Sequence, residues 1–466
     1  MIFEVSNKIK VENPTSELTS WCFENLIIEN PDYYKKQRMG LWCGNVPQHL
    51  ALYERDGNNL YLPYGCLMKL YSMYKDDSVF YTGIRKRGEA INYQSCINLY
   101  PYQEKAVTEA LRRKNGIIVM PCGSGKTQTA LEIISRIGGK CLWLTHTQDL
   151  LNQSLNRAKS TLNINSNSYG TITGGKVNIG TGITFATVQT MSKIDLHQFR
   201  DSWDVIIVDE CHKAVGSPTK AMQFYKVLSN ISCRYKIGLT ATPKRADGLE
   251  TMMFALIGDM IYEVSRGDVA NTTCPVKVRF VNTRYSPNLD LALSGDGTIN
   301  YAGLVDDITH NNDRFYDVVS ESVRTAMNGP TIVLANRVEY LLRMTDVMEK
   351  AGVEAVCLSS MGNSKAAKAQ RKEVLNRLNN GDIGCVLATY QLAKEGLDVP
   401  NLRHVVFATP EKDETTVMQA AGRVGRKADG KEFGEIIDFV DSGFGMFRGW
   451  AKKREGYYKK LGYTVL

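Results

Sequence analysis

Two short segments, far apart in the chain, carry residue types suited to holding and cleaving a phosphate chain. Residues 121–127 combine glycines with Lys126 and Thr127. Glycines let successive backbone N–H groups face an anion, lysine adds positive charge at the outer phosphates, and a hydroxyl can bind Mg²⁺. Residues 419–426 carry Arg423 and Arg426, whose spacing places them on one face of a helical turn. Because guanidinium groups stabilise a phosphoryl group in transfer, the two segments predict one ATP-hydrolysing site shared by two domains.

The elements around the first segment support this interpretation. Residues 116–120 are apolar and predict a buried strand, and residues 128–133 continue as a helix. A strand, a glycine-rich loop and a helix in this order are typical of a phosphate-binding loop. Met120 stands where the usual pattern has its first glycine, so the prediction depends on this context. The residues expected to bind the phosphates are Gly123, Ser124, Gly125, Lys126 and Thr127.

Two acids and an amide are candidates to complete the site. Asp209 and Glu210 follow an apolar run at 205–208. The first carboxylate can join Thr127 in the Mg²⁺ shell, and the second can orient or deprotonate the attacking water. Upstream, Gln103 carries a donor and an acceptor that match the edge of adenine.

Length and composition limit the classes of protein. A chain of 466 residues and 52.1 kDa is too long for one core, so two or three domains are expected. The sequence contains neither an apolar run long enough for a membrane span nor a signal segment, so we expect no membrane partner. Eleven cysteines without a C-x-x-C pair give little support to a metal centre and fit the cytoplasm. The net charge of +8 permits a nucleic-acid partner without demonstrating one.

Three regions differ in pattern. Residues 1–95 are rich in Tyr and Trp, with a hairpin expected between 50–53 and 60–62, and predict a small β-containing N-terminal domain that could bind DNA. Residues 96–265 and 266–466 alternate apolar runs with helix-length segments, which is typical of α/β lobes with parallel sheets. The strands expected in the first lobe are 116–120, 141–145, 182–186, 204–208 and 236–240. Those expected in the second are 331–335, 354–358, 384–388, 404–408 and 434–440, after a linker at 266–330. The tail, 444–466, predicts a basic, aromatic helix.

Six blocks in order resemble the superfamily-two helicases, and more closely the XPB-like branch that includes phage branch-migration proteins. The blocks are Tyr102-Gln103, the phosphate loop, and residues 209–212, 240–243, 388–398 and 419–426. The resemblance covers roughly residues 96–442. His212 in the acidic block differs from the DEAD-box pattern. Residues 245–247, Arg-Ala-Asp, depart from the Arg-Glu-Asp of XPB-like proteins, which leaves a duplex-opening role of this loop open.

The resemblance implies two RecA-like lobes with ATP and Mg²⁺ bound between them. Tyr102, Gln103, Gly396 and Asp398 would contact ATP, and Gln419, Arg423 and Arg426 would act from the second lobe. Thr240 and Thr242 look like the element that couples hydrolysis to movement. The positions that match the family's nucleic-acid contacts are Thr145, Gln153, Thr173, Thr187, Gln189 and Thr389.

The sequence therefore predicts an ATP-dependent DNA helicase or translocase. We expect it to act on duplex or branched DNA such as forks and junctions, in recombination, repair or replication, and a contact with single-stranded DNA is left open. A monomeric motor in the cytoplasm is expected, in a bacterial host if the phage resemblance holds. An RNA helicase remains open, since no residue pattern distinguishes a 2′-hydroxyl reader. An ATP-gated clamp that binds nucleic acid without travelling is also open.

Overall fold

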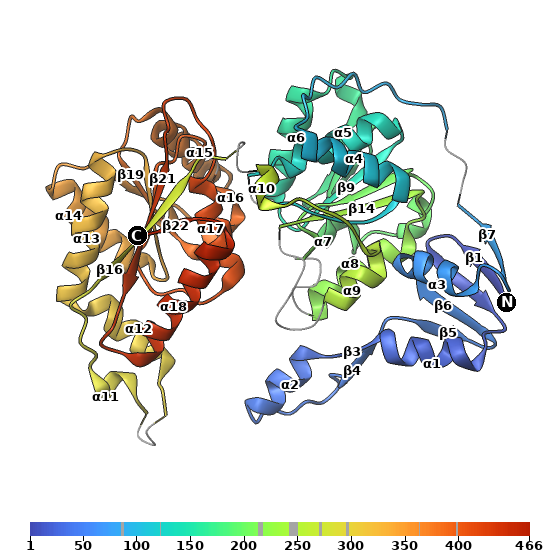
Figure 1. The fold of residues 1–466 in the computed structure, drawn as a ribbon, viewed down its shortest axis with the longest axis horizontal. Coiled ribbons are helices and arrows are strands. Elements are labelled where there is room, and N and C mark those ends of the chain that lie inside the picture. Colours follow the sequence, from blue (N-terminus) through green and yellow to red (C-terminus); the bar gives the residue numbers. More distant parts are fainter. Residues whose placement is uncertain are drawn as a thin grey trace. The chain divides into compact units, whose positions relative to one another are not determined.

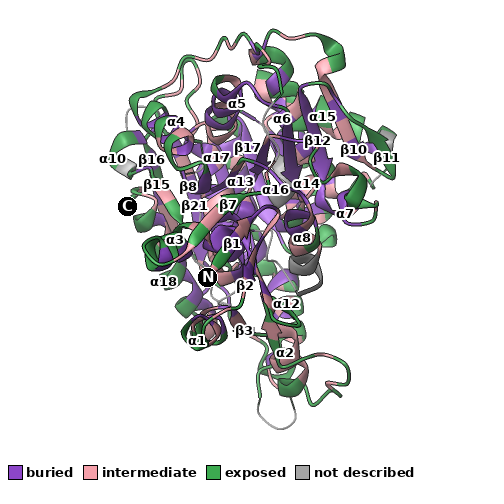
Figure 2. Cartoon of the chain, turned by 90° about the vertical axis from the view of Figure 1, so that its right-hand side faces the viewer, coloured by how far each residue is buried: buried purple, intermediate pink, exposed green. Residues whose placement is uncertain are grey.

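The chain forms two compact α/β units. The computed structural model describes residues 1–84, 88–121, 123–212, 218–241, 250–269, 273–294, 298–362, 364–397 and 399–466. One unit comprises Met1–Pro121 and Gly125–Ser265, and the other comprises Cys122–Ser124 and Arg266–Leu466 (Figure 1). Figure 2 shows that the buried residues concentrate in the sheets and on the helix faces that cover them. No helix of the described residues is long and apolar enough to cross a membrane.

The N-terminal part of the first unit is a five-stranded sheet in the order β5-β6-β2-β1-β7. Its strands are β1 Ile2–Val5, β2 Lys8–Glu12, β5 Glu54–Asp56, β6 Asn59–Pro63 and β7 Val79–Thr82. Its helical segments are α1 Ser16–Asn25, η1 Tyr64–Cys66 and α3 Leu67–Tyr74. β3 Ile27–Glu29 and β4 His49–Ala51 form a separate strand pair, and α2 Pro31–Arg38 lies between them in the sequence.

The hairpin predicted between 50–53 and 60–62 is wrong in its first strand. The partner of β6 is β5, with Asp56 opposite Asn59, so that only Gly57 and Asn58 remain in the turn. Gly57 has φ +56°, as two-residue hairpin turns require. The two-residue turn places residues 54–56 opposite 59–61, and residues 49–51 pair instead with Ile27–Glu29.

The rest of the first unit is an eight-stranded sheet in the order β11-β10-β12-β9-β13-β14-β8-β15. The five strands predicted for this lobe are present within about one residue of the expected bounds: β8 Asn115–Val119, β9 Cys141–Thr145, β12 Ile183–Thr187, β13 Val205–Val208 and β14 Tyr235–Thr240. Three strands were not predicted: β10 Tyr169–Thr173, β11 Lys176–Asn178 and β15 Met260–Glu263. The helices are α4 Pro101–Arg113, α5 Lys126–Ile137, α6 Gln148–Thr161, α7 Val188–Met191, α8 Pro218–Asn230 and α9 Glu250–Ile257, with the short η2 Ser166–Ser168 and η3 Leu196–Phe199.

The N-terminal sheet and the larger sheet share one hydrophobic core. Side chains such as Phe3 and Leu60 belong to the same buried cluster as Phe224 and Met252. At the boundary, a Cβ added to Gly65 would lie 2.3 Å from the Phe254 carbonyl oxygen, so η1 packs directly on the backbone of α9. The two parts of this unit are therefore held together by continuous packing.

The second unit is a seven-stranded parallel sheet in the order β18-β19-β17-β20-β21-β16-β22. All five strands predicted for this lobe are present: β17 Thr331–Ala335, β18 Ala355–Cys357, β19 Cys385–Thr389, β20 His404–Phe407 and β21 Gly434–Val440. The additional strands are β16 Val276–Asn282 and β22 Thr464–Val465. The helices are α10 Arg266–Val269, α11 Leu289–Ala292, α12 Tyr301–His310, α13 Asn312–Met327, α14 Val338–Lys350, η5 Leu358–Ser360, α15 Lys365–Asn380, α16 Tyr390–Gly396, α17 Glu414–Val424 and α18 Gly445–Lys460.

Two expectations for this unit are revised. The stretch 266–330 is not only a linker, because β16 pairs with β21 along seven residues. The tail forms the predicted helix, α18, but part of its basic character is structural. Arg454 is buried and binds both carboxylate oxygens of Asp438 through Nε (2.8 Å) and Nη2 (2.7 Å). The exposed cations of α18 are Arg448, Lys452, Lys453, Lys459 and Lys460.

Candidate nucleotide-binding site

Three chemically important loops follow neighbouring strands of the first unit. β14 pairs in parallel with both β8 and β13, so the carboxyl ends of all three strands meet at one edge of the sheet. The phosphate loop follows β8, Asp209 and Glu210 follow β13, and Thr240 ends β14. The Met120 N–H also donates to the Thr240 carbonyl at 2.8 Å. This edge is where ligands bind in open α/β sheets.

The phosphate loop has the backbone that its glycines make possible. Gly123 and Gly125 adopt φ values of +83° and +81°, and α5 begins directly at Lys126. A Cβ added to Gly125 would lie only 2.3 Å from the Nε2 atom of Gln103. Met120 is buried and lies outside the positive-φ region, so its replacement of the usual glycine imposes no backbone strain.

A chain of polar contacts crosses the site from the phosphate loop to β14. The Lys126 ammonium lies 3.8 Å from Glu210 Oε1 and donates to the Met120 carbonyl at 3.5 Å. Glu210 Oε2 is 3.3 Å from His212 Nδ1, which in turn is 2.9 Å from the Thr240 hydroxyl. Glu210 has φ +48°, a conformation that costs free energy in a non-glycine residue and that is concentrated at functional sites. In the sequence, His212 served only to distinguish this chain from the DEAD-box pattern, whereas the structure places it between Glu210 and Thr240.

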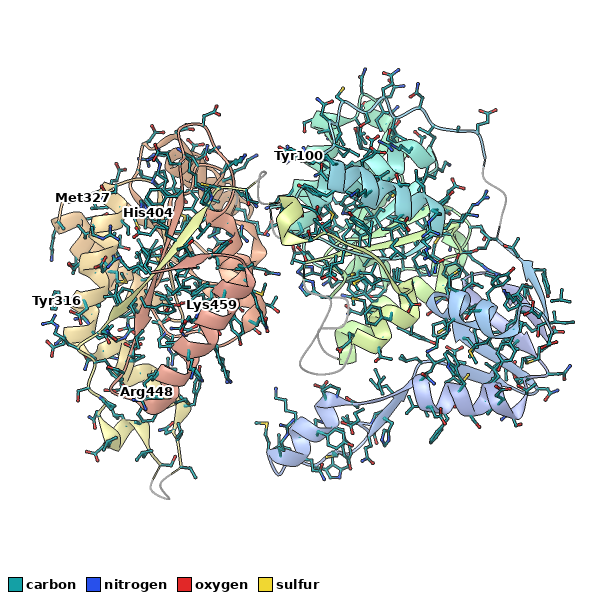
Figure 3. All side chains as sticks on the ribbon, viewed as in Figure 1. Tyr100, Tyr316, Met327, His404, Arg448 and Lys459 are labelled. Atoms are coloured by element: carbon teal, nitrogen blue, oxygen red, sulfur yellow. The ribbon has the colours of Figure 1, made fainter. Side chains whose placement is uncertain are left out.

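Gln103 caps the amino terminus of α4, the helix to which it belongs. The Gln103 Oε1 atom accepts the Tyr100 N–H at 2.9 Å, and the amide is buried against Gly125. Tyr102 is buried, while the ring of Tyr100 stacks on it at a centroid distance of 5.7 Å and is 48% exposed (Figure 3). Tyr100 is therefore the accessible aromatic side chain beside Gln103, and the sequence interpretation missed it. Its position three residues before Gln103, the expected adenine contact, was the available signal.

An ion-pair network fixes α4 against α5. Arg136 donates to both Glu104 oxygens at 2.5 and 2.6 Å and, through Nε, to Glu132 at 2.8 Å. Ser95 donates to the other Glu132 oxygen at 2.6 Å. The network fixes the helix of Gln103 relative to the helix that begins at the phosphate loop.

The second unit carries the predicted arginines in two different settings. Arg423 lies in α17, and its guanidinium donates to the carbonyls of Ala393 and Leu397 at the end of α16. The helix ends at Val424, and the Arg426 N–H donates to the Arg423 carbonyl at 3.4 Å, so Arg426 lies in the turn that follows the helix. Gln419 is half-buried in α17.

Lys431 holds the end of α17 in place. Its Nζ donates to the carbonyls of Val424 (2.6 Å) and Arg426 (2.9 Å). Burial lowers the pKa of Lys431 to about 8. Gly396 is the last residue of α16, and Asp398 lies outside the described residues, as do Thr242 and residues 245–247.

The candidate nucleic-acid residues differ in accessibility. Thr145 and Thr187 are buried, and their hydroxyls donate at 3.0 Å to the Thr147 carbonyl and the Thr190 hydroxyl. The Thr389 hydroxyl accepts the Leu392 N–H at the start of α16 (3.3 Å). Gln189 is half-buried, and its amide donates to the His146 carbonyl (2.9 Å). The two remaining candidates are the exposed Gln153 and the half-buried Thr173, which precedes the Gly174–Gly175 turn.

The donor set of the first unit suits Mg²⁺. The hydroxyl of Thr127 and the carboxylate of Asp209 are hard oxygen ligands, and Mg²⁺ is usually held by one or two carboxylates together with substrate phosphates. No cluster of three His, Cys, Asp or Glu side chains among the described residues is arranged to hold a metal by itself. The residues present therefore fit a cation that arrives with a nucleotide.

The phosphate loop, the acid pair and the two α/β units are the features expected of an ATP-dependent helicase. Residues 96–245 match the family of the type III restriction enzyme res subunit, and residues 313–428 match the helicase conserved C-terminal domain. The DNA-bound Type ISP restriction-modification enzyme LlaBIII has a similar fold, with a TM-score of 0.58 and 19% identity over 78% of this chain and 30% of that chain.

Two curated relatives place the chain more closely. One is the putative ATP-dependent RNA helicase L396 of Acanthamoeba polyphaga mimivirus, which is 26% identical over 83% of this chain and 74% of the relative. The other is the DNA 3'-5' translocase XPB2 of Sulfurisphaera tokodaii, which is 25% identical over 77% of this chain and 85% of the relative. The chain thus carries two helicase-type domain matches on a two-lobed α/β fold, and it is similar to superfamily-two helicases of the XPB-like and viral kinds.

Proposed function

We propose that this protein is an ATP-dependent DNA helicase or translocase that acts on duplex or branched DNA, such as forks and junctions. The observation that carries the proposal is the convergence of the phosphate loop, Asp209, Glu210 and Thr240 at one edge of a parallel sheet. The choice of DNA is supported by the relative named as a DNA translocase, which spans most of the chain. The relative named as an RNA helicase favours the second candidate, an RNA helicase.

The residues at this edge of the eight-stranded sheet divide the chemistry of hydrolysis between them. The backbone of residues 123–126 would hold the phosphates, with the Lys126 ammonium at the outermost one. Mg²⁺ held by Thr127 and Asp209 would neutralise phosphate charge. An incoming phosphate would compete with Glu210 for Lys126, since the two side chains are only 3.8 Å apart. The Glu210 carboxylate would then be available to accept a proton from the attacking water.

Two further steps connect hydrolysis to movement. Because His212 lies between Glu210 and the Thr240 hydroxyl, a change at the carboxylate reaches the coupling threonine through one side chain. From the second unit, Gln419, Arg423 and Arg426 would stabilise charge on the γ-phosphoryl group. An arginine in that position is typically worth about 10³–10⁵ in rate.

The ATPase rate with and without nucleic acid tests the proposal. We expect slow hydrolysis alone and strong stimulation by DNA. Lys126→Ala and Arg426→Ala should each abolish turnover while DNA binding survives. Lys105→Ala, which removes an exposed lysine of α4, should behave like the wild type and serves as the control. Equal rates with and without every nucleic acid tested would refute the proposal, and normal turnover in either active-site variant would refute the role assigned to that residue.

Two comparisons separate the alternatives. Stronger stimulation by RNA than by DNA would indicate an RNA helicase. A triplex-displacement assay distinguishes a motor from an ATP-gated clamp, because a motor strips the third strand with ATP and a clamp does not.

A further inference from the structure

Residues 27–51 form an ordered projection from the N-terminal sheet, which we call the arm (Figure 1). β3 and β4 pair along three residues at its base, and α2 lies beyond them. The buried Asn30 closes the arm: its backbone N–H donates to the Gln48 carbonyl at 2.9 Å and its Nδ2 to the Pro47 carbonyl at 2.7 Å. The base of the arm therefore has a defined structure.

The tip of the arm exposes apolar side chains. No residue of α2 is buried, and Met39 and Leu41 are more than half exposed. Trp42 is 84% exposed, the largest value for any large apolar side chain of the described residues. A Cβ added to Gly44 would lie 2.3 Å from the Trp42 ring, so the glycine allows the ring to lie close to the backbone. Exposed apolar surface of this kind marks an interaction site.

The same tip is positively charged. Lys35, Lys36 and Arg38 lie in the last turn of α2, and residues 33–53 contain no Asp or Glu. Cations beside an exposed aromatic ring are the combination by which proteins bind nucleic acid, since the cations meet phosphates and the ring stacks on a base. A protein partner of ordinary composition, with charges of both signs, would gain less binding free energy from a stretch without acidic residues.

We propose that the tip of the arm binds the junction between duplex and single-stranded DNA. Trp42 stacks on the base pair that the junction exposes, while Lys35, Lys36 and Arg38 contact the flanking phosphates. A junction fits better than continuous duplex because the face of a base is accessible only where stacking is interrupted. The arm shares the core of the first unit through Ile28, so a movement of that unit carries Trp42 with it. The inference rests on the proposed function for the identity of its nucleic acid.

Fork binding without ATP tests the role of Trp42 directly. We would compare Trp42→Ala with Phe23→Ala, because Phe23 is another exposed aromatic residue of the same domain, at 67%. Stacking of one base predicts that Trp42→Ala binds a fork roughly 5- to 150-fold more weakly, with Trp42→Tyr retaining most of the affinity. A 2-aminopurine at the junction should change its fluorescence on binding of the wild type and Phe23→Ala but not of Trp42→Ala.

Two further measurements distinguish stacking from a general loss of function. ATPase activity stimulated by long single strands should remain within about two-fold in Trp42→Ala, while fork unwinding falls with fork affinity. The triple variant Lys35→Gln, Lys36→Gln, Arg38→Gln should weaken binding to all DNA and reduce the slope of log K against log salt by about 2–3.

The inference is overturned if Trp42→Ala and Phe23→Ala bind and unwind the fork equally well. It is also overturned if Trp42→Ala changes self-association in sedimentation while fork binding stays intact, because the tip would then be a protein contact. A wild-type protein without DNA binding or DNA-stimulated ATPase would refute the proposed function itself. An active wild type with an unaffected Trp42→Ala would refute only the role of the arm.

Discussion

Replacement of Arg454 by methionine should strongly destabilise the second unit. Arg454 and Asp438 are 1% and 0% exposed, and the guanidinium binds both carboxylate oxygens. Arg454 also donates to the Glu411 carbonyl at 3.0 Å, in the segment that leads into α17. After the substitution, the buried Asp438 carboxylate would keep the Tyr458 hydroxyl, at 2.7 Å, but would lose its counter-ion.

Removing one partner of a buried ion pair typically costs about 3–5 kcal/mol. At about 1.4 kcal/mol for each factor of ten, opening of the second unit should become roughly 10²- to 10⁴-fold more frequent. Hydrogen exchange of β21 amides, measured by mass spectrometry, reports this opening for the second unit alone. That restriction matters because a chain of two units need not unfold in one step.

The control is Arg448→Met in the same helix, because Arg448 is exposed and its replacement should be nearly neutral (Figure 3). The double variant Arg454→Met, Asp438→Asn should recover part of the loss, since it removes the uncompensated charge. An acceleration of less than ten-fold in Arg454→Met, or one equal to that in Arg448→Met, would refute the reasoning.

The structure determines the direction of two other effects, one on stability and one on nucleotide binding. Burial lowers the pKa of His404 from 6.5 to about 4. As the pH falls through this range, the unfolded chain takes up a proton that the folded chain does not. The second unit should therefore have its full stability above pH 6.5, and its free energy of unfolding should fall by about 2 kcal/mol by pH 5. His404→Asn should flatten this dependence in hydrogen exchange and His310→Asn, an exposed control, should not; an unchanged profile in His404→Asn would contradict the assignment. Gly125→Ala should weaken binding of a fluorescent ATP analogue more in the wild-type background than in Gln103→Ala, because the new methyl group meets the Gln103 amide. An equal loss of affinity in both backgrounds would show that this contact is unimportant.

The sequence was most informative where strands are buried on both faces. β9 and β17 have the predicted bounds because central parallel strands appear as nearly uninterrupted apolar runs. β16 was missed because Lys277 and Arg279 interrupt its apolar residues, a pattern of strands buried on one side only. Its place beside β21 depends on strand order across the sheet, which local sequence does not encode.

The same distinction applies to the site. The phosphate loop and the acids after β13 could be located from local pattern because each needs only its own strand, turn and helix. The contact of His212 with Thr240 could not, since it depends on β13 and β14 being neighbours. The exposure of Trp42 was equally hidden, because composition shows that an aromatic residue is present but not that it lacks a core to enter.

The arginine pair shows how spacing can mislead even within a correctly identified segment. Two arginines three positions apart suggest two equivalent side chains on one helical face, yet α17 ends at Val424, Lys431 binds the Val424 carbonyl, and Arg426 lies in the turn that follows. Arg423 instead ties α17 to the end of α16 through two backbone carbonyls, so its removal would disturb the second unit as well as any contact with ATP. Arg426 stands beyond the helix. A loss of turnover in Arg423→Ala alone would therefore not assign a catalytic role to this residue, because the same substitution removes two contacts that hold α17 to α16.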